Sequence, residues 1–309
     1  MGDGPCPRPD APMSAFTHSA FFTPRRSFTV PLPGGASLEL GERTLVMGVL
    51  NVTPDSFADG GRFIDPARAA DAALAMEAAG ADLIDVGGES TRPGAESVGA
   101  DEERARIEPV LERLAGHLKV PISIDTYKAV VAQAAIDRGA AIVNDISALR
   151  YDPELAPVVA RARAALILMH NRGRSREMYR AADYRNVAED VAQELDERIS
   201  AAGAEGIPRE HLIVDPGIGF AKRAEQSLAM LAGLTALAWL ERPVLVGPSR
   251  KSFLRAALGE RPADEREWAT AAAVTASVLL GAHIVRVHGV PEMVDVVRTA
   301  DAIRQAARM

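Results

Sequence analysis

The chain has 309 residues, of which 48% are hydrophobic and 25% are charged, enough for one large buried core. Its net charge of −7 argues against a broad nucleic-acid surface. The single cysteine, Cys6, excludes a disulfide framework and a cysteine-based metal site, and no apolar run reaches the roughly 18 residues of a membrane span. We therefore expect a globular cytoplasmic protein that binds small molecules rather than nucleic acid or membranes.

The N-terminal segment, residues 1–26, is predicted to be a disordered tail. It is rich in proline between Pro5 and Pro12 and lacks the apolar core of a signal peptide. A short β-hairpin is expected next, from Ser27–Val30 and Ala36–Leu40 with a Pro-Gly-Gly turn between them.

From Thr44 onward, strand-like and helix-like segments alternate to the C-terminus. The strand-like segments are mostly continuous apolar runs, as expected for parallel strands that are covered on both faces. They are Thr44–Asn51, Leu83–Gly88, Pro121–Thr126, Ile142–Ile146, Ala165–His170, His211–Gly217, Pro243–Ser249 and Ile284–His288. Ala-rich amphipathic segments such as "DPARAADAALAMEAAG" lie between them.

Eight strand–helix units predict a closed (β/α)8 TIM barrel, with residues 27–309 forming a single domain. The structural rival is a doubly wound open sheet, which usually places a G-x-G-x-x-G turn after its first strand. This chain has "NVTPDSF" at that place, so we favour the barrel.

Nearly every predicted strand ends in polar residues, for example "LNVTPDSF", "VGGESTRPG", "SIDTYK" and "VDPGIGFAK". The C-terminal ends of parallel barrel strands all face the same side, which is where barrel enzymes bind their ligands. We therefore expect these distant residues to meet at one mouth.

Three polar residues, Asp125, Asn144 and Asp215, belong to the strands themselves and should lie low in that mouth. Buried carboxylates need a cation or several hydrogen-bond donors. A flat, donor-rich heterocycle such as a 2-aminopyrimidinone would meet that need, and Lys251 would pair with its carbonyl or with Asp215. The alternative interpretation is a structural salt-bridge network in the barrel core.

Lys251 is one of only four lysines in the chain, the others being Lys119, Lys128 and Lys222. Because arginine fills nearly every other basic position, a lysine indicates either a need for a compact, titratable ammonium group or mere codon bias.

Arg286 and His288 are two residues apart on the last predicted strand, so their side chains share one face. With Arg92 from an earlier loop they would form a cationic rim that suits a phosphate or diphosphate. His170 has no such neighbour in the sequence, and its role stays open between structural and functional.

The loop after the first barrel strand carries Asn51, Asp55 and Asp59. Their oxygens suit Mg²⁺, an ion that keeps several waters and is commonly shared with substrate phosphates. We therefore expect Mg²⁺ as a cofactor near Asn51.

At this point the chain resembles a known family. The motifs "MGVLNVTPDSFADGG", "DVGGESTRPGA", "ISIDTYK", "VNDIS", "MHNRG", "DPGIGFAK", "SRKSF" and "RVH" are closely similar to those of the dihydropteroate synthases, folate-pathway transferases targeted by sulfonamides. The resemblance runs from about Thr44 to the C-terminus. It implies a (β/α)8 barrel, usually a Mg²⁺-dependent homodimer, that condenses 6-hydroxymethyl-7,8-dihydropterin diphosphate with p-aminobenzoate and releases diphosphate.

The resemblance also implies roles for individual residues. Pterin binding would fall to Asp125, Asn144, Asp215 and Lys251, and diphosphate binding to Asn51, Thr91, Arg92, Arg286 and His288. The aminobenzoate site would consist of Phe57, Pro93, Phe220 and Ser249. Asn51 would ligate Mg²⁺, and the catalytic set would be Asn51, Asp125, Lys251, Arg286 and His288. The loops that carry Asp55, Asp59, Thr91 and Arg92 would act as mobile lids.

The sequence departs from this pattern at three positions. Gly289 stands where many relatives carry Asp, Ala221 where a glycine is usual, and Asn171 where methionine is common. None of them removes a contact implied above, so we expect them to affect affinity rather than activity.

Two other functions remain open on the sequence alone. One is a catalytically silent pterin-binding paralogue, which the intact Asn51, Phe57, Arg92 and Lys251 argue against. The other is a pterin-dependent methyltransferase of the same barrel superfamily, which should lack the "DSF" and "STRP" lid segments that are present here.

Overall fold

The computed structural model describes residues 23–53, 65–90, 97–174 and 178–306. Within them, parallel strands form one eight-stranded sheet in the order β8-β7-β6-β5-β4-β3-β10-β9. A parallel bridge between Val214 and Val244 joins its two ends, so the sheet closes into a barrel. The barrel strands are β3 (Leu45–Asn51), β4 (Leu83–Gly87), β5 (Ile122–Asp125), β6 (Ala140–Asp145), β7 (Ala165–Met169), β8 (Leu212–Asp215), β9 (Leu245–Val246) and β10 (Ile284–Val287). The predicted (β/α)8 barrel is confirmed.

Every predicted barrel strand is present, but some of the predicted ends are wrong. β6 starts at Ala140 rather than at Ile142, and β9 contains only Leu245–Val246, although the apolar run predicts Pro243–Ser249. Pro248 has no backbone N–H to donate to a neighbouring strand, which accounts for the early end of β9.

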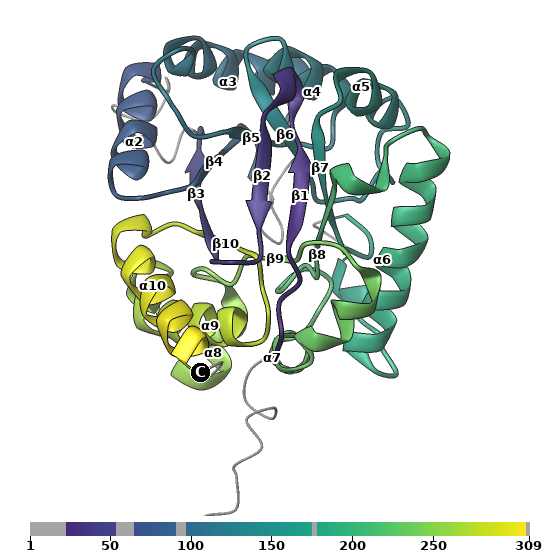
Figure 1. The fold of residues 1–309 in the computed structure, drawn as a ribbon, viewed down its shortest axis with the longest axis vertical. Helices are drawn as coiled ribbons and strands as arrows, with labels where there is room; N and C mark the ends of the chain where they lie inside the picture. The colour runs from purple at the N-terminus through teal and green to yellow at the C-terminus, as the bar shows by residue number, and fades with distance from the viewer. Residues whose placement is uncertain (1–22, 54–64, 91–96, 175–177, 307–309) are drawn as a thin grey trace, which may run out of the picture.

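Each barrel strand is followed by helical structure, and the helices form a ring around the barrel (Figure 1). They are α2 (Pro66–Ala78), α3 (Ala100–Leu114), α4 (Ala129–Ile136), α5 (Leu155–Ala162), α6 (Val187–Ala204), α7 (Ala224–Ala232), α8 (Arg255–Leu258), α9 (Glu267–Leu279) and α10 (Val290–Ala306). The Asp-Pro pair starts α2 as predicted, because Asp65 Oδ1 accepts the N–H of Ala67 at 2.9 Å and Pro66 occupies the first turn. No helix in the part of the chain that the structure describes is long and apolar enough to cross a bilayer.

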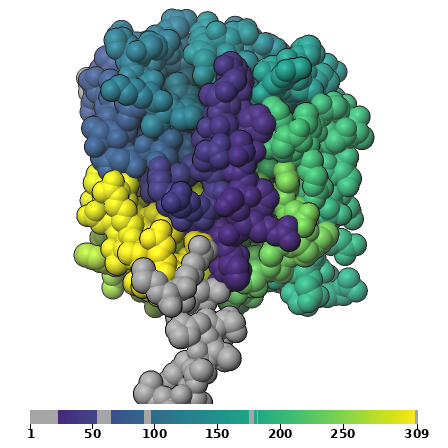
Figure 2. Space-filling view, viewed as in Figure 1, coloured from purple at the N-terminus to yellow at the C-terminus, as the bar shows by residue number. Residues whose placement is uncertain are grey.

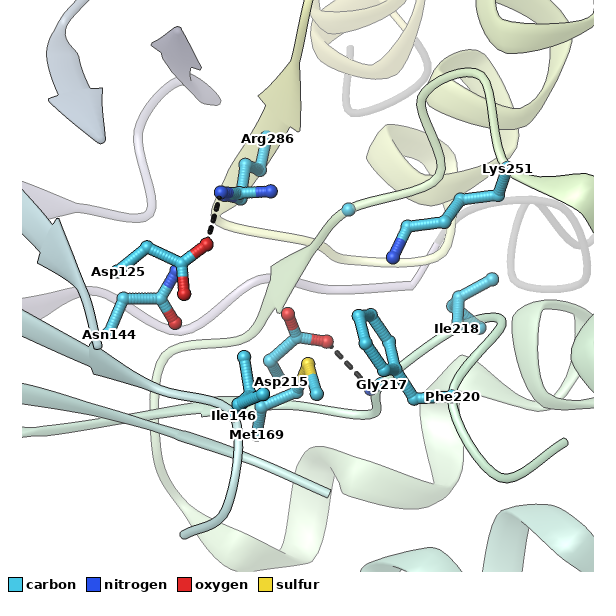
Figure 3. Close-up of a pocket in the computed structure, with 11 residues that line it drawn as sticks. Asp125, Asn144, Ile146, Met169, Asp215, Gly217, Ile218, Phe220, Lys251 and Arg286 are labelled. Atoms are coloured by element: carbon cyan, nitrogen blue, oxygen red, sulfur yellow. Dashed lines mark hydrogen bonds and ion pairs between the residues drawn. The ribbon is translucent and has the colours of Figure 1, made fainter. Parts of the chain in front are cut away.

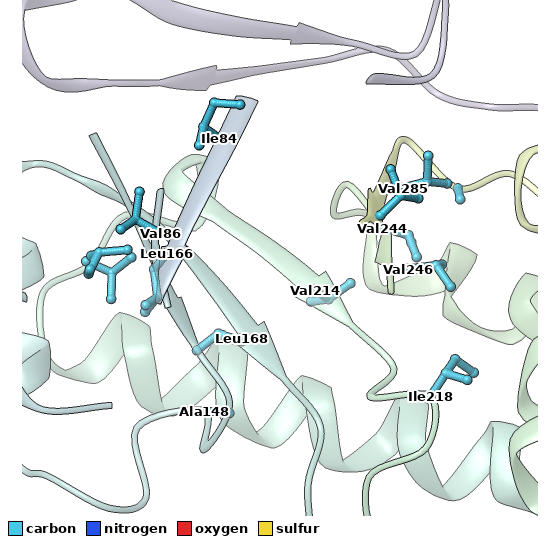
Figure 4. Packing of buried hydrophobic residues seen from close by; sticks show 14 of the residues in the cluster. Ile84, Val86, Ala148, Leu166, Leu168, Val214, Ile218, Val244, Val246 and Val285 are labelled. Atoms are coloured by element: carbon cyan, nitrogen blue, oxygen red, sulfur yellow. The ribbon is translucent and has the colours of Figure 1, made fainter. Parts of the chain in front are cut away.

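The barrel strands alternate between two apolar clusters, as the two-residue period of a strand requires. Outward side chains of β4, β7, β8, β9 and β10 pack with the surrounding helices, among them Ile84, Val86, Leu166, Leu168, Val214, Val246 and Val285 (Figure 4). Inward side chains form a second cluster in the N-terminal half of the barrel, made of Met47, Leu83, Ile142, Ile167, Ile213, Leu245 and Ile284. The lower part of the barrel is therefore a packed apolar core rather than a channel.

The predicted N-terminal hairpin is also confirmed, and it closes one end of this core. β1 (Phe28–Pro31) pairs antiparallel with β2 (Ser37–Leu40) through a short turn at Pro33–Gly35. Val30, Leu32, Leu38 and Leu40 belong to the same buried cluster as the inward residues of the barrel. The hairpin lies across the N-terminal end of the barrel (Figures 1 and 2), so the C-terminal end is left for ligands.

Part of the predicted tail, residues 1–26, contacts the barrel, because the Thr23 N–H donates to the Leu279 carbonyl at 3.1 Å and Arg25 is buried. The buried Arg25 donates through Nη2 to Thr44 Oγ1 at 2.8 Å and to Asp301 Oδ1 on α10 at 3.4 Å. Asp301 Oδ2 accepts the backbone N–H of Thr44 at 2.5 Å, directly before β3. Residues 1–22, the rest of the predicted tail, lie outside the described residues.

Replacing Asp301 by Ala should lower the free energy of unfolding by about 2–4 kcal/mol, because Arg25 and Thr44 lose a buried acceptor. Asp295→Ala, at an exposed position of the same helix, is the control and should change it by no more than about 0.5 kcal/mol. Urea unfolding followed by circular dichroism measures both. Equal stabilities of the two variants would contradict the anchoring role of Asp301.

Candidate active site

The inward side chains change from apolar to polar at one level of the barrel. Leu83, Ile142, Ile213 and Ile284 of the inner cluster are followed, two residues further along their strands, by Asp85, Asn144, Asp215 and Arg286. Asp125 at the end of β5 is aligned with Asn144 and joins the same level. The predicted convergence of Asp125, Asn144 and Asp215 is thus confirmed, and these groups rest on an apolar floor.

A pocket of about 330 Å³, counted to its open mouth, lies on this polar layer. It is lined by Asp125, Asn144, Ile146, Met169, Asp215, Gly217, Ile218, Phe220, Gly247, Lys251 and Arg286. Figure 3 shows Asp125 and Asn144 side by side across the pocket from Lys251, with Ile146, Met169 and Phe220 beside Asp215. Apolar walls with a few convergent polar groups suit a flat, polar-edged ring.

Arg286 binds two carboxylates at once. Its Nε donates to Asp85 Oδ2 at 2.6 Å and its Nη2 donates to Asp125 Oδ2 at 2.8 Å. Asn144 Nδ2 donates to the same Asp85 oxygen at 2.9 Å. One guanidinium therefore compensates two carboxylates that burial alone would make very costly.

Two features of this cluster differ from the sequence-based interpretation. Arg286 is predicted at the rim beside His288, but its side chain lies in the polar layer, where it forms ion pairs with Asp85 and Asp125. In the register of the sheet, Arg286 is aligned with Met47 of β3, a residue of the inner apolar cluster. Asp85, which is completely buried, is absent from the predicted site. The signal for it is the two-residue period of "LIDVG", which puts Asp85 on the same face as the core residue Leu83.

The pocket contains acceptors that have no donor within the described part of the chain. They are Asp125 Oδ1 and Asn144 Oδ1, and Asp85 Oδ1 lies buried and unpartnered behind them. A buried acceptor without a donor costs about 1–3 kcal/mol. The site is thus prepared to receive N–H groups from a ligand.

Burial also shifts the proton affinities of the pocket. It raises the pKa of Asp125 to about 7 in spite of the opposing charge of Arg286, and it raises the pKa of Asp215. Burial, together with the positive charge of Arg286, lowers the pKa of Lys251 to about 7. The charges of this pocket therefore respond to pH near neutrality.

Lys251 and Asp215 do not pair as directly as the sequence suggests. The Lys251 ammonium lies 3.8 Å from the centre of the Phe220 ring, a cation–π contact. Asp215 Oδ1 instead accepts the backbone N–H of Gly217 at 2.7 Å. Both groups nevertheless line the same pocket, so each has a face open to a ligand.

Ser249 and Lys251 are held in position by helix α9 through the residue between them. Arg250 has a left-handed backbone (φ 58°), with its N–H donating to Thr270 Oγ1 at 3.0 Å and its Nε to Glu267 Oε2 at 2.8 Å. Ser249 Oγ in turn accepts the N–H of His288 at 3.2 Å and lies 3.0 Å from its Nδ1. The residues predicted for the aminobenzoate and diphosphate sites are thereby linked at the mouth.

The structure explains two of the three departures from the family pattern, those at Gly289 and Ala221. A Cβ at Gly289 would lie 2.2 Å from Glu267 Oε1, so a carboxylate from α9 takes the space that a side chain would need. Ala221 has a left-handed backbone (φ 47°), which explains why a glycine is usual there. Asn171 is buried, and nothing in the structure explains its choice.

Other predicted residues lie at the mouth, outside the pocket lining, or beyond the described residues. Asn51 ends β3 at the mouth, aligned with Gly87 of β4. His170 is buried outside the pocket lining, between Lys222 and Glu194. The predicted loop residues Asp55, Phe57, Asp59, Thr91, Arg92 and Pro93 lie outside the described residues, and their roles stay predictions.

Comparison with known proteins agrees with this geometry. The family model for pterin binding enzymes matches residues 47–288. Dihydropteroate synthase from Synechocystis sp. is 45% identical over 277 residues, which cover 89% of this chain and 96% of that protein. The solved structure of Xanthomonas albilineans dihydropteroate synthase with 4-aminobenzoic acid has a TM-score of 0.82 at 39% identity and covers 89% of this chain and 99% of its own.

A second solved structure, Burkholderia cenocepacia dihydropteroate synthase complexed with 7,8-dihydropteroate, has a TM-score of 0.80 at 40% identity. The similarity covers 91% of this chain and 99% of that one. With the same barrel, nearly full mutual coverage and an acceptor-rich pocket at the barrel mouth, the chain belongs to the pterin-binding enzyme family, among the dihydropteroate synthases.

Proposed function

We propose that this transferase joins 6-hydroxymethyl-7,8-dihydropterin diphosphate to p-aminobenzoate and forms 7,8-dihydropteroate and diphosphate, a step of folate synthesis. The observation that carries the proposal is a pair of acceptors, Asp125 Oδ1 and Asn144 Oδ1, that have no donor among the described residues and belong to a pocket with apolar walls. The amino group and ring N–H of a pterin present matching donors on one edge. An assay with both substrates, in which product formation is followed, tests the proposal directly.

Within this pocket the pterin would be bound by its polar edge and its faces. Asp125, Asn144 and Asp215 would accept its N–H groups, and Lys251 would donate to its ring carbonyl. Met169 and Phe220, both buried, would contact the ring faces. Phe220, which the resemblance assigns to the aminobenzoate site, lines the pocket of Asp125, Asn144 and Asp215, so we propose it as a pterin contact instead. This arrangement leaves the exocyclic carbon pointing toward the mouth, where the second substrate arrives.

The reaction would need charge compensation more than proton transfer. As the C–O bond to diphosphate breaks, positive charge grows on the exocyclic carbon and is shared with the pterin ring, which lies beside the carboxylates of Asp125 and Asp215. The amino nitrogen of p-aminobenzoate then forms the C–N bond as a neutral nucleophile and loses its proton to water. His288, Asn51 and the loop residue Arg92 would hold the diphosphate at the mouth, and Ser249, bonded to His288, would lie at the aminobenzoate site.

We propose Mg²⁺ as the cofactor, held by the side-chain oxygen of Asn51 and by the diphosphate. Asn51 is half-buried at the end of β3, and a neutral oxygen ligand suits this ion. Among the described residues there is no group of three or more His, Cys, Asp or Glu that could hold a metal ion. When bound, Mg²⁺ would offset the negative charge of the leaving diphosphate.

Two further assignments stay predictions. The homodimer rests on the resemblance in the sequence, and the cytoplasmic location rests on the single cysteine, Cys6.

Asp125→Asn should weaken the binding of a diphosphate-free pterin about tenfold or more, because a charged acceptor is lost. Titration calorimetry measures the affinity, with the exposed Asp137→Asn as control. The wild-type affinity should also fall as the pH drops below about 7, since the Asp125 carboxylate takes up a proton there. Unchanged affinity in Asp125→Asn would contradict the assignment, and a wild-type affinity that does not change with pH would contradict the raised pKa of Asp125.

Arg286→Ala should weaken the binding of pterin both with and without the diphosphate. It leaves the Asp85 and Asp125 carboxylates uncompensated, so we expect a loss of about tenfold or more for either ligand. Arg185→Ala, whose side chain is 92% exposed, is the matched control. If only the diphosphate-bearing ligand loses affinity, Arg286 acts at the rim and the proposed role in the polar layer is wrong.

Removal of Mg²⁺ with a chelator should abolish product formation, and added Mg²⁺ should restore it. Binding of a diphosphate-free pterin should not change under the same conditions, because the ion is proposed to act on the diphosphate alone. Product formation at the full rate in the presence of excess chelator would refute the Mg²⁺ requirement.

A further inference from the structure

The loop that follows β8, residues 216–222, forms one wall of the pocket in a backbone conformation that needs support. Gly217, Gly219 and Ala221 all have left-handed φ angles, of 65°, 81° and 47°. A Cβ at Gly217 would lie 2.0 Å from the carbonyl oxygen of His170, so the loop passes very close to β7. From this loop Gly217, Ile218 and Phe220 reach the pocket, and the Gly217 N–H donates to Asp215.

Lys222 lies behind this wall, outside the set of pocket-lining residues, and only 1% of it is exposed. Its ammonium donates to the carbonyl oxygens of Gly217 at 3.2 Å and Phe220 at 3.1 Å. Its third partner is His170 Nδ1 at 2.9 Å. One buried side-chain nitrogen thus connects the two pocket-lining residues, Gly217 and Phe220, to His170 at the end of strand β7.

The groups around Lys222 are themselves fixed. His170 Nε2 lies 3.0 Å from Glu194 Oε2 on α6, and an ionised carboxylate can only accept, so the imidazole proton is on Nε2 and Nδ1 accepts from Lys222. Burial and the charge of Lys222 lower the pKa of His170 to about 3, so this ring stays a neutral acceptor. Tyr184 adds a bond from its hydroxyl to the Ala221 carbonyl at 3.0 Å, at the residue with the unfavourable φ.

We propose that Lys222 is a positioning residue for the pterin pocket: its ammonium holds the turn 217–221 in the shape that presents Phe220 and the Gly217 N–H. The inference rests on the function proposed above. It explains why a lysine with three donors, rather than an arginine with a planar fork, stands in this place in an arginine-rich chain. It also gives His170, which does not line the pocket, a role as the neutral acceptor that anchors Lys222.

The opposing interpretation is that Lys222 contributes only to folding. A purely structural role predicts that a variant loses stability and that its folded fraction keeps normal substrate affinity. A positioning role predicts a change in affinity for the pterin in the folded protein, with a smaller change for the second substrate, since the turn contacts the pterin end of the site.

The test is Lys222→Met, which keeps the length of the side chain and removes its donors, with the exposed Lys119→Met as matched control. At a temperature well below the unfolding midpoint, we expect the Kd for a diphosphate-free pterin and the KM for pterin diphosphate to rise about tenfold. The KM for p-aminobenzoate and kcat at saturation should each change by less than about threefold. Unchanged pterin affinity, or equal losses in both KM values and kcat, would overturn the proposal.

If Lys222→Met does not fold, Tyr184→Phe provides a second test of whether the turn 217–221 must be held in place for pterin binding. It removes only the bond to Ala221 at the periphery, so a smaller rise in the pterin Kd is expected, and no rise would count against the proposal. Pterin binding by the wild-type protein distinguishes a failure of the proposed function from a failure of the proposed role of Lys222. If it does not bind pterin, the proposed function fails, whereas wild-type binding that both variants retain refutes only the role of Lys222.

Discussion

The site depends on one guanidinium that binds two buried carboxylates inside a barrel. Arg286 contacts Asp85 and Asp125 from a third strand, and both contacts are shorter than 3 Å. Without that cation, two acidic groups at one level of the barrel would repel each other and lose their hydration. With it, Asp125 has one oxygen bound to Arg286 and one oxygen that no donor contacts within the described residues, as a binding site for N–H donors requires.

The rest of the architecture provides a firm base for this layer. The inner apolar cluster, which includes residues of the hairpin, fills the N-terminal half of the barrel, so the polar groups lie on a layer of packed apolar side chains. On the sides, the turn after β8 is held by Lys222, and the residues after β9 are held by α9 through Arg250. Binding groups are therefore placed by strands or by buttressed turns, which limits their motion before substrate arrives.

Much of this was accessible from the sequence, and the reasons are physical. Continuous apolar runs and their polar ends predicted the barrel and the convergence of Asp125, Asn144 and Asp215, because parallel strands leave few arrangements for such a pattern. The short length of β9 cannot be predicted from the apolar run, because hydrophobicity carries no information about the N–H that Pro248 lacks. The level of Arg286 was also missed, because the register between strands is set by packing and not by the segment itself.

Asp85 illustrates a different limit. It lies inside an apolar run, where a single acidic residue does not change the prediction of a buried strand. Its partners, Asn144 and Arg286, are 59 and 201 positions away along the chain. The arrangement around Lys222 was invisible for a similar reason, since its bonds to backbone carbonyls depend on a turn whose shape the sequence does not reveal. Contacts between residues far apart in the chain, and hydrogen bonds to backbone carbonyls, can be identified only in the folded structure.

The contact between Glu267 and Gly289 bears on how this chain is compared with its relatives. The Glu267 carboxylate, which also binds Arg250, fills the volume that a side chain at 289 would occupy. The negative charge beside Gly289 is therefore supplied by a neighbouring helix rather than by residue 289 itself. A side chain at position 289 would have to displace the Glu267 carboxylate, so the effect of a substitution at Gly289 depends on Glu267 and on its bond to Arg250.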